Sequence, residues 1–306
     1  MAGNPVFSNF DKNLRSGQYA GFGSQQQGAQ PGYGQQQFGQ QPGYGQPGFQ
    51  QRPYGQQPFG QQGFDQQYAP QAPMQQSRGR SMTMDDVVMK SIALFGLLIV
   101  VAGGSWVFAQ RAIDSQQNTT VLGLWAGGAI VSLVLSLIIA FRKTISVPLI
   151  IAFTLAEGVF VGAVSAFFNT AYPGVVVQAV LATLCVFAGV LLGYKTGLIR
   201  VTARSRRIFM YMLIGYMLFA LVNFVLVLTG LQEGFGIGGS GPLGIAISIF
   251  AVALASYSLA IDFDSISDGV RAGVPEKTSW LLAYGLLVSV VWLYIEMLRL
   301  LARLRD

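Results

Sequence analysis

Seven apolar stretches follow one another between Val87 and Ala302, and each is about long enough to cross a lipid bilayer. A transmembrane helix needs about 20 predominantly apolar residues. By this criterion the spans are roughly 91–109, 121–141, 145–168, 172–194, 208–230, 240–263 and 279–302. The connections between them are too short to fold separately. The sequence therefore predicts an all-α membrane protein, with a seven-transmembrane-helix bundle over residues 81–306.

The composition excludes several other classes of protein. Hydrophobic residues make up 52% of the chain and charged residues 10%, against about 25% charged in an average soluble domain. The chain has no histidine and one cysteine, which rules out histidine-based metal sites, Ser-His-Asp or Cys-His catalysis, disulfides and a histidine pH switch. A retinal-binding protein is disfavoured because no lysine lies inside the last six spans. We therefore expect no enzymatic activity, and no cofactor apart from a calcium ion.

The first 80 residues have a different composition, rich in Gln, Gly and Pro with an aromatic residue about every five positions. Such a segment has no aliphatic residues to bury, so we predict a disordered low-complexity tail at 1–80. Evenly spaced aromatic residues in a polar chain are typical of self-associating segments. The alternative is a solvated tail without a specific partner. The tail lacks the apolar region of a signal peptide, so the first span is expected to direct insertion.

Lysine and arginine residues predict the orientation of the spans, because cytoplasmic loops carry an excess of them. They gather before the first span and after the second, fourth and sixth, so we expect a cytoplasmic tail. This pattern explains the pI near 9.5 better than binding to nucleic acid does. Seven crossings put the carboxyl terminus outside, although Arg299, Arg303 and Arg305 would favour the inside. The last span either crosses against the rule or is re-entrant and surrounded by the other helices.

Four acidic residues lie in or at the end of the spans: Glu157, Asp262, Asp264 and Glu296. A carboxylate in hydrocarbon is costly, so it is neutral, paired with a cation or part of an ion pathway. Arg299 lies three residues beyond Glu296 and offers a charge partner. For Asp264 the alternative is a solvated helix end. Glu157 has no basic residue within helical reach, which favours a functional role.

The rise of an α-helix, about 1.5 Å per residue, indicates which acids could meet. Glu157 and Asp262 come out about 18 and 16 Å from the cytoplasmic side, and Glu296 at about 25 Å. The first two are therefore expected to be level. A direct contact between Asp262 and Glu296 requires a bent, tilted or re-entrant last helix.

The segments "AIDFDSISDGVRAG" and "LVSVVWLYIEMLRLLARL" resemble the end of the Bax inhibitor-1 family, in its bacterial YccA/YetJ-like branch. "LAEGVFVGAVSAFF" and "YPGVVVQAVLATLCVFAGV" resemble the third and fourth helices of that family. The likeness covers about residues 82–306 and not the Gln-rich tail. It implies a seven-helix bundle whose last helix is surrounded by the others, and a location in a bacterial cell membrane.

The resemblance also implies a function, a pH-sensitive calcium leak governed by two acidic residues on the sixth and seventh helices. By motif match these are Asp262 and Glu296, which would also be the calcium ligands. A carboxyl pair that shares one proton could hold a pore shut and open as both groups ionise. Calcium is a hard cation and would compete for the same oxygens.

A second hypothesis belongs to a different class of function. The chain would be a non-transporting regulatory protein that binds a membrane protease or another membrane complex. The tail would then be the segment that binds the partner, and the acidic residues would have structural roles. Under either hypothesis the lipid bilayer surrounds the spans, and self-association through the tail is a further expected interaction. Measuring ion flux separates the two hypotheses. Only the first predicts that neutralising Glu157 or Asp262 changes the ion flux, whereas the second predicts a change in complex formation.

Overall fold

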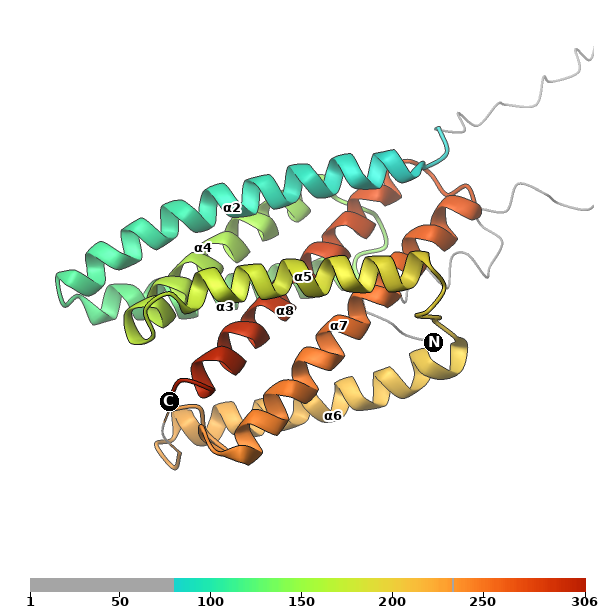
Figure 1. Ribbon diagram of the computed structural model, residues 1–306. Helices are drawn as coiled ribbons and strands as arrows, with labels where there is room; N and C mark the ends of the chain where they lie inside the picture. Colours follow the sequence, from blue (N-terminus) through green and yellow to red (C-terminus); the bar gives the residue numbers. More distant parts are fainter. Residues whose placement is uncertain (1–79, 233) are drawn as a thin grey trace, which may run out of the picture. The chain divides into compact units, whose positions relative to one another are not determined.

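The computed structural model describes residues 80–232 and 234–306, and over these residues the secondary structure is helical. The predictions for the tail lie outside the described residues. Seven of the described helices are long and apolar enough to cross a membrane. They are α2 (Met84–Asp114), α3 (Asn118–Phe141), α4 (Val147–Ala171), α5 (Val175–Lys195), α6 (Ala203–Leu228), α7 (Pro242–Arg271) and α8 (Thr278–Arg303) (Figure 1). The predicted all-α fold with seven spans is confirmed.

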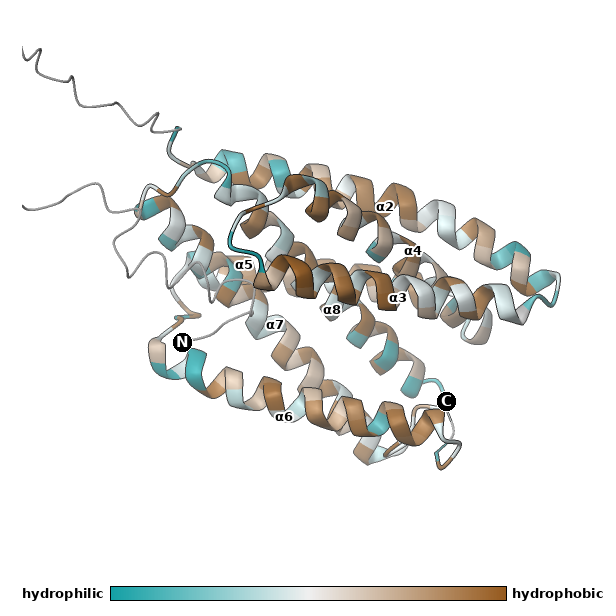
Figure 2. Ribbon diagram, turned by 180° about the vertical axis from the view of Figure 1, so that it is seen from behind, coloured by the Kyte–Doolittle hydropathy of each residue, from teal (hydrophilic) through white to brown (hydrophobic). Residues whose placement is uncertain are grey.

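Polar segments extend two helices beyond the apolar spans predicted for them. α2 begins at Met84 because the Thr83 hydroxyl accepts a hydrogen bond from Asp86 N and the Asp86 carboxylate accepts one from Thr83 N. This reciprocal cap satisfies two backbone donors that a helix start leaves open. α7 continues past the predicted end at residue 263 to Arg271. Figure 2 shows the result, with apolar residues along most of each helix and polar ones gathered mainly near the ends.

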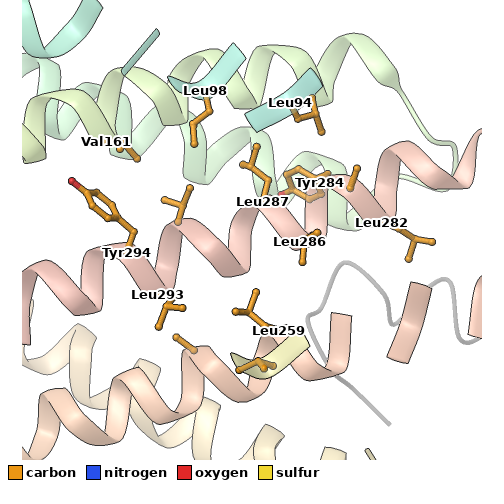
Figure 3. Packing of buried hydrophobic residues seen from close by; sticks show 14 of the residues in the cluster. Leu94, Leu98, Val161, Leu259, Leu282, Tyr284, Leu286, Leu287, Leu293 and Tyr294 are labelled. Atoms are coloured by element: carbon orange, nitrogen blue, oxygen red, sulfur yellow. The ribbon is translucent and has the colours of Figure 1, made fainter. Parts of the chain in front are cut away.

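Helix α8 is the central element of the bundle and packs against α2, α4, α5 and α7. Leu94 and Leu98 of α2 and Leu259 of α7 surround Leu287 of α8 (Figure 3). By contrast, α6 packs beside α7 at one edge (Figure 1). Its other faces expose large apolar side chains, as expected for a helix that faces lipid.

The last helix crosses the whole bundle. Just before its start, Glu276 forms an ion pair with Lys90 of α2, with 3.0 Å between Nζ and Oε1. At the opposite end the buried Arg303 guanidinium donates to Gly244 O and, over 3.2 Å, to the Ser248 hydroxyl. Of the two alternatives for this span, the re-entrant one is therefore wrong. Oxygen acceptors from the chain explain how an arginine is tolerated at that end.

Two glycines of α4 allow close contact with α2. A Cβ atom on Gly158 would lie 2.8 Å from Val101 Cβ, and one on Gly162 would lie 2.7 Å from Ser105 Cβ. Both distances are shorter than normal carbon contacts, so the small side chains are what permit this approach. Comparable glycine spacings elsewhere do not have this role, because a Cβ on Gly123, Gly127 or Gly189 would have no neighbour within 4 Å among the described residues.

Candidate functional site

Asp262 is a fully buried carboxyl group on α7, with 0% of its surface exposed. Within residues 80–232 and 234–306, neither of its carboxylate oxygens has a hydrogen-bond partner. Ser258 and Ser265 are also buried on α7, but their hydroxyls donate to the backbone of their own helix. The Ser289 hydroxyl of α8 faces Asp262 without forming a hydrogen bond. Polar groups therefore surround this carboxyl but do not satisfy it.

A network of charged residues lies next to Asp262, toward the end of α7. Asp264 forms an ion pair with Arg206 of α6 and accepts a hydrogen bond of 3.2 Å from the Tyr194 hydroxyl of α5. Arg206 also lies 3.8 Å from Asp268, which in turn pairs with Arg271 at 3.0 Å. Asp264 is therefore not a solvated helix end, as its alternative interpretation required. Through these contacts Asp264 connects α5, α6 and α7 close to the buried Asp262 carboxyl.

Glu296 is as deeply buried as Asp262, at 2% exposed, but it has several donors. Its Oε1 accepts hydrogen bonds from the Tyr216 hydroxyl of α6 at 2.6 Å, Trp292 Nε1 at 3.1 Å and Arg299 Nη1 at 3.3 Å. The Arg299 guanidinium also donates to the Tyr216 oxygen at 3.1 Å. We call Glu296, Arg299, Tyr216 and Trp292 the Glu296 cluster. It links α6 to α8 through the hydrogen bonds and the ion pair of the Glu296 carboxyl group.

The structure does not bring Asp262 and Glu296 together. Ser289 is the residue of α8 that faces Asp262, and Glu296 lies seven residues beyond it, which is about 10 Å along a helix. The contact between Arg303 and Ser248 is consistent with this antiparallel register of α7 and α8. A shared proton or calcium ion directly between the two carboxyls therefore does not fit this arrangement, because α8 is a continuous helix.

Glu157 lies near the middle of α4, beside different helices. Ser132 of α3 faces it, although the Ser132 hydroxyl donates to Ala129 O of its own helix, and the phenol of Tyr284 on α8 lies close to it. Phe153, one turn before Glu157, packs edge-on against Tyr284 with 4.8 Å between ring centroids. Tyr284 lies five residues before Ser289 on α8, which is about 7.5 Å along the helix, so Glu157 and Asp262 face different turns of α8. They contact different sets of residues.

Sequence reasoning missed Arg206, Tyr216, Trp292 and Ser289. Tyr216 and Arg206 are 80 and 58 positions from the acids they contact, and no local spacing connects residues that far apart. A signal was present for Trp292, which lies four residues before Glu296 and so on the same helix face. Tyr216 had no such signal, because Tyr211 and Asn223 are also polar residues of the same span.

Within the described part of the chain, no group of three or more Asp, Glu, Cys or His residues could hold a metal ion. Seven membrane-length helices with separate buried carboxylates define an integral, multi-pass membrane protein. More particularly, residues 4–306 match the model of the family described as Bax inhibitor 1 like, so the chain belongs to the Bax inhibitor-1 family. This match also includes most of the tail, which the resemblance noted above did not cover. No curated protein matches the chain.

Proposed function

We propose that the protein is a pH-sensitive cation leak pathway for calcium or protons, with Asp262 as the gating carboxyl. The observation that carries this proposal is the complete burial of Asp262 with both oxygens unpartnered. Membership of the Bax inhibitor-1 family supports a membrane function without enzymatic activity. Asp262 differs in this respect from Asp264 and Glu296, which both have arginine partners.

The chemistry of a buried acid connects this geometry to gating. An ionised carboxylate without a partner costs several kcal/mol in an apolar interior. The closed arrangement therefore corresponds to protonated Asp262. When Asp262 loses its proton, the bundle is stabilised by admitting water or a cation to the carboxylate, and oxygen ligands suit calcium. Leak should therefore rise as the pH rises.

The charged network beside Asp262 fits the cytoplasmic end of this pathway. Arg206, Asp264 and Asp268 lie at the end of the bundle whose loops carry the most lysine and arginine, which the positive-inside rule assigns to the cytoplasm. In this orientation the tail is cytoplasmic and the Glu296 cluster lies toward the opposite side. The Arg206–Asp264 ion pair would then separate Asp262 from the cytoplasm.

Calcium flux from purified protein in liposomes, measured from pH 6 to pH 8, tests the proposal. We expect flux that increases with pH in the parent protein and loses its pH dependence in Asp262→Asn, which removes the titrating group at nearly constant volume. Asp114→Asn is the matched control, because it makes the same chemical change at an exposed position at the end of α2, outside the charged network beside Asp262. It should keep the pH dependence of the parent.

Absence of flux from the parent, or equal pH dependence in Asp262→Asn, would sink the proposal. The hypothesis of a regulatory protein that binds a membrane protease or another complex would then replace it. Co-purification of the parent and Asp262→Asn from native membranes would test that second function.

A further inference from the structure

A second polar site lies between α3, α4 and α8, away from Asp262. A Cβ on Gly128 of α3 would lie 2.9 Å from Phe160 N of α4, and this contact indicates the antiparallel register of the two helices. One turn along, this register puts Ser132 level with Glu157, and Ser132 is the α3 side chain that faces it. A further turn along, Ser136 accepts a hydrogen bond of 2.9 Å from the Tyr284 hydroxyl. We call Glu157, Ser132, Ser136 and Tyr284 the Glu157 site.

The groups that face Glu157 carry no positive charge. From α3 and α8 they are the serine and tyrosine hydroxyls of the site, and from α2 they are Leu98 and Val101, which approach the adjacent Gly158. Helix α5 has three ionisable side chains: Cys185 and Lys195 are exposed, and Tyr194 donates to Asp264. Tyr284 is therefore the titratable group that faces Glu157 from the helices packed against α4, within the described residues.

We propose that the Glu157 site binds a monovalent cation of the Na⁺ type in exchange for the proton of Glu157. In the proton-bound state the carboxyl group is neutral. In the exchanged state the O–H bond breaks, the proton leaves to solvent, and the carboxylate oxygens with the Ser132, Ser136 and Tyr284 hydroxyls surround the ion. Both states are electrically neutral, so neither leaves a net charge in the membrane interior.

The charge of the site selects the class of ion. Hard cations prefer oxygen ligands, and the four side chains supply up to five oxygens. A divalent ion with one carboxylate would leave a net charge of +1 among apolar residues, which costs several kcal/mol. A monovalent ion is neutralised completely. This site is independent of the leak proposed for Asp262, so either proposal can fail without the other.

Two measurements on the purified full chain in detergent test the site. The first is the temperature of half-unfolding in NaCl against choline chloride at equal ionic strength, because a ligand that binds the native state stabilises it. We expect a rise with Na⁺ that is larger at pH 8 than at pH 6, since protons compete. The second is proton release into weakly buffered solution when Na⁺ is added, with one proton released for each ion bound. This second measurement needs no variant.

Variants separate ligand binding from packing. Glu157→Gln should abolish both Na⁺ responses, and Tyr284→Phe should weaken apparent Na⁺ affinity ~10-fold by removing one oxygen. Tyr294→Phe is the matched control, because Tyr294 forms a similar hydroxyl pair with Ser165 of α4 at 2.7 Å without being part of the site. It should keep the parent response. No Na⁺ response in the parent, or equal losses in Tyr284→Phe and Tyr294→Phe, would overturn the proposal.

Discussion

Asp262 and Glu296 lie on neighbouring helices and are almost equally buried, yet their surroundings are opposite. Asp262 has no hydrogen-bond partner within the described residues, whereas Glu296 accepts from a tyrosine, a tryptophan and an arginine. Burial alone therefore does not determine what an intramembrane acid can do. The donors around Glu296 make it a structural link between α6 and α8, and the absence of such donors around Asp262 is the difference on which its proposed gating role rests.

Among the changes that test this comparison, we expect Arg299→Gln to lower the free energy of unfolding most. It leaves the carboxylate of Glu296 without its cation in the interior, and breaking a buried ion pair is strongly destabilising. Because 36% of the Arg299 side chain is exposed, we expect a loss of about 2–3 kcal/mol, below the values for fully buried pairs. Chemical denaturation in detergent measures it.

The control for this change is Arg271→Gln, which breaks another i,i+3 pair, with Asp268. Its side chains are 70% and 48% exposed, so the loss should be below about 1 kcal/mol. Equal losses for the two variants would contradict the structural role assigned to the Glu296 cluster.

A smaller effect is expected from Tyr216→Phe, which removes one donor to Glu296 and leaves the ring in place. Loss of a hydrogen bond to a charged group costs about 1–2 kcal/mol. Tyr257→Phe is the matched control, because the buried Tyr257 hydroxyl has no partner in the described part of the chain. Denaturation should show a loss for Tyr216→Phe and little change for Tyr257→Phe, and the reverse order would show that the Tyr216 contact contributes nothing.

The difference between the two acids could be predicted only in part from the sequence. Arg299 was identified as a charge partner because i,i+3 spacing fixes two side chains on one helix face. The constant rise of a helix likewise predicted that Glu296 lies deeper than Asp262. Tyr216 could not be identified, because its contact with Glu296 depends on how α6 and α8 pack, and span length and hydropathy do not determine that packing.

The glycine patterns had the same limit. The four-residue spacing of Gly158 and Gly162 indicates a shared face of small residues, and in the structure this face packs closely against α2. Gly123 and Gly127 have the same spacing, but a Cβ on either would have no neighbour within 4 Å among the described residues. The adjacent Gly128 is the residue of α3 that approaches Phe160 of α4. A spacing pattern shows that small residues share a face, but not which neighbour that face contacts. The number of helices was predictable because it depends on span length alone.

The most direct test of the account is the pH dependence of calcium flux in liposomes for the double variant Glu296→Gln/Arg299→Gln, compared with Asp262→Asn. Removing both members of a buried pair is tolerated far better than removing one, so the double variant should fold. We predict that it keeps the pH dependence of the parent, whereas Asp262→Asn loses it. If both lose it, and adding Asp262→Asn to the double variant changes nothing further, the two acids act as one coupled pair and Asp262 is not the gate by itself.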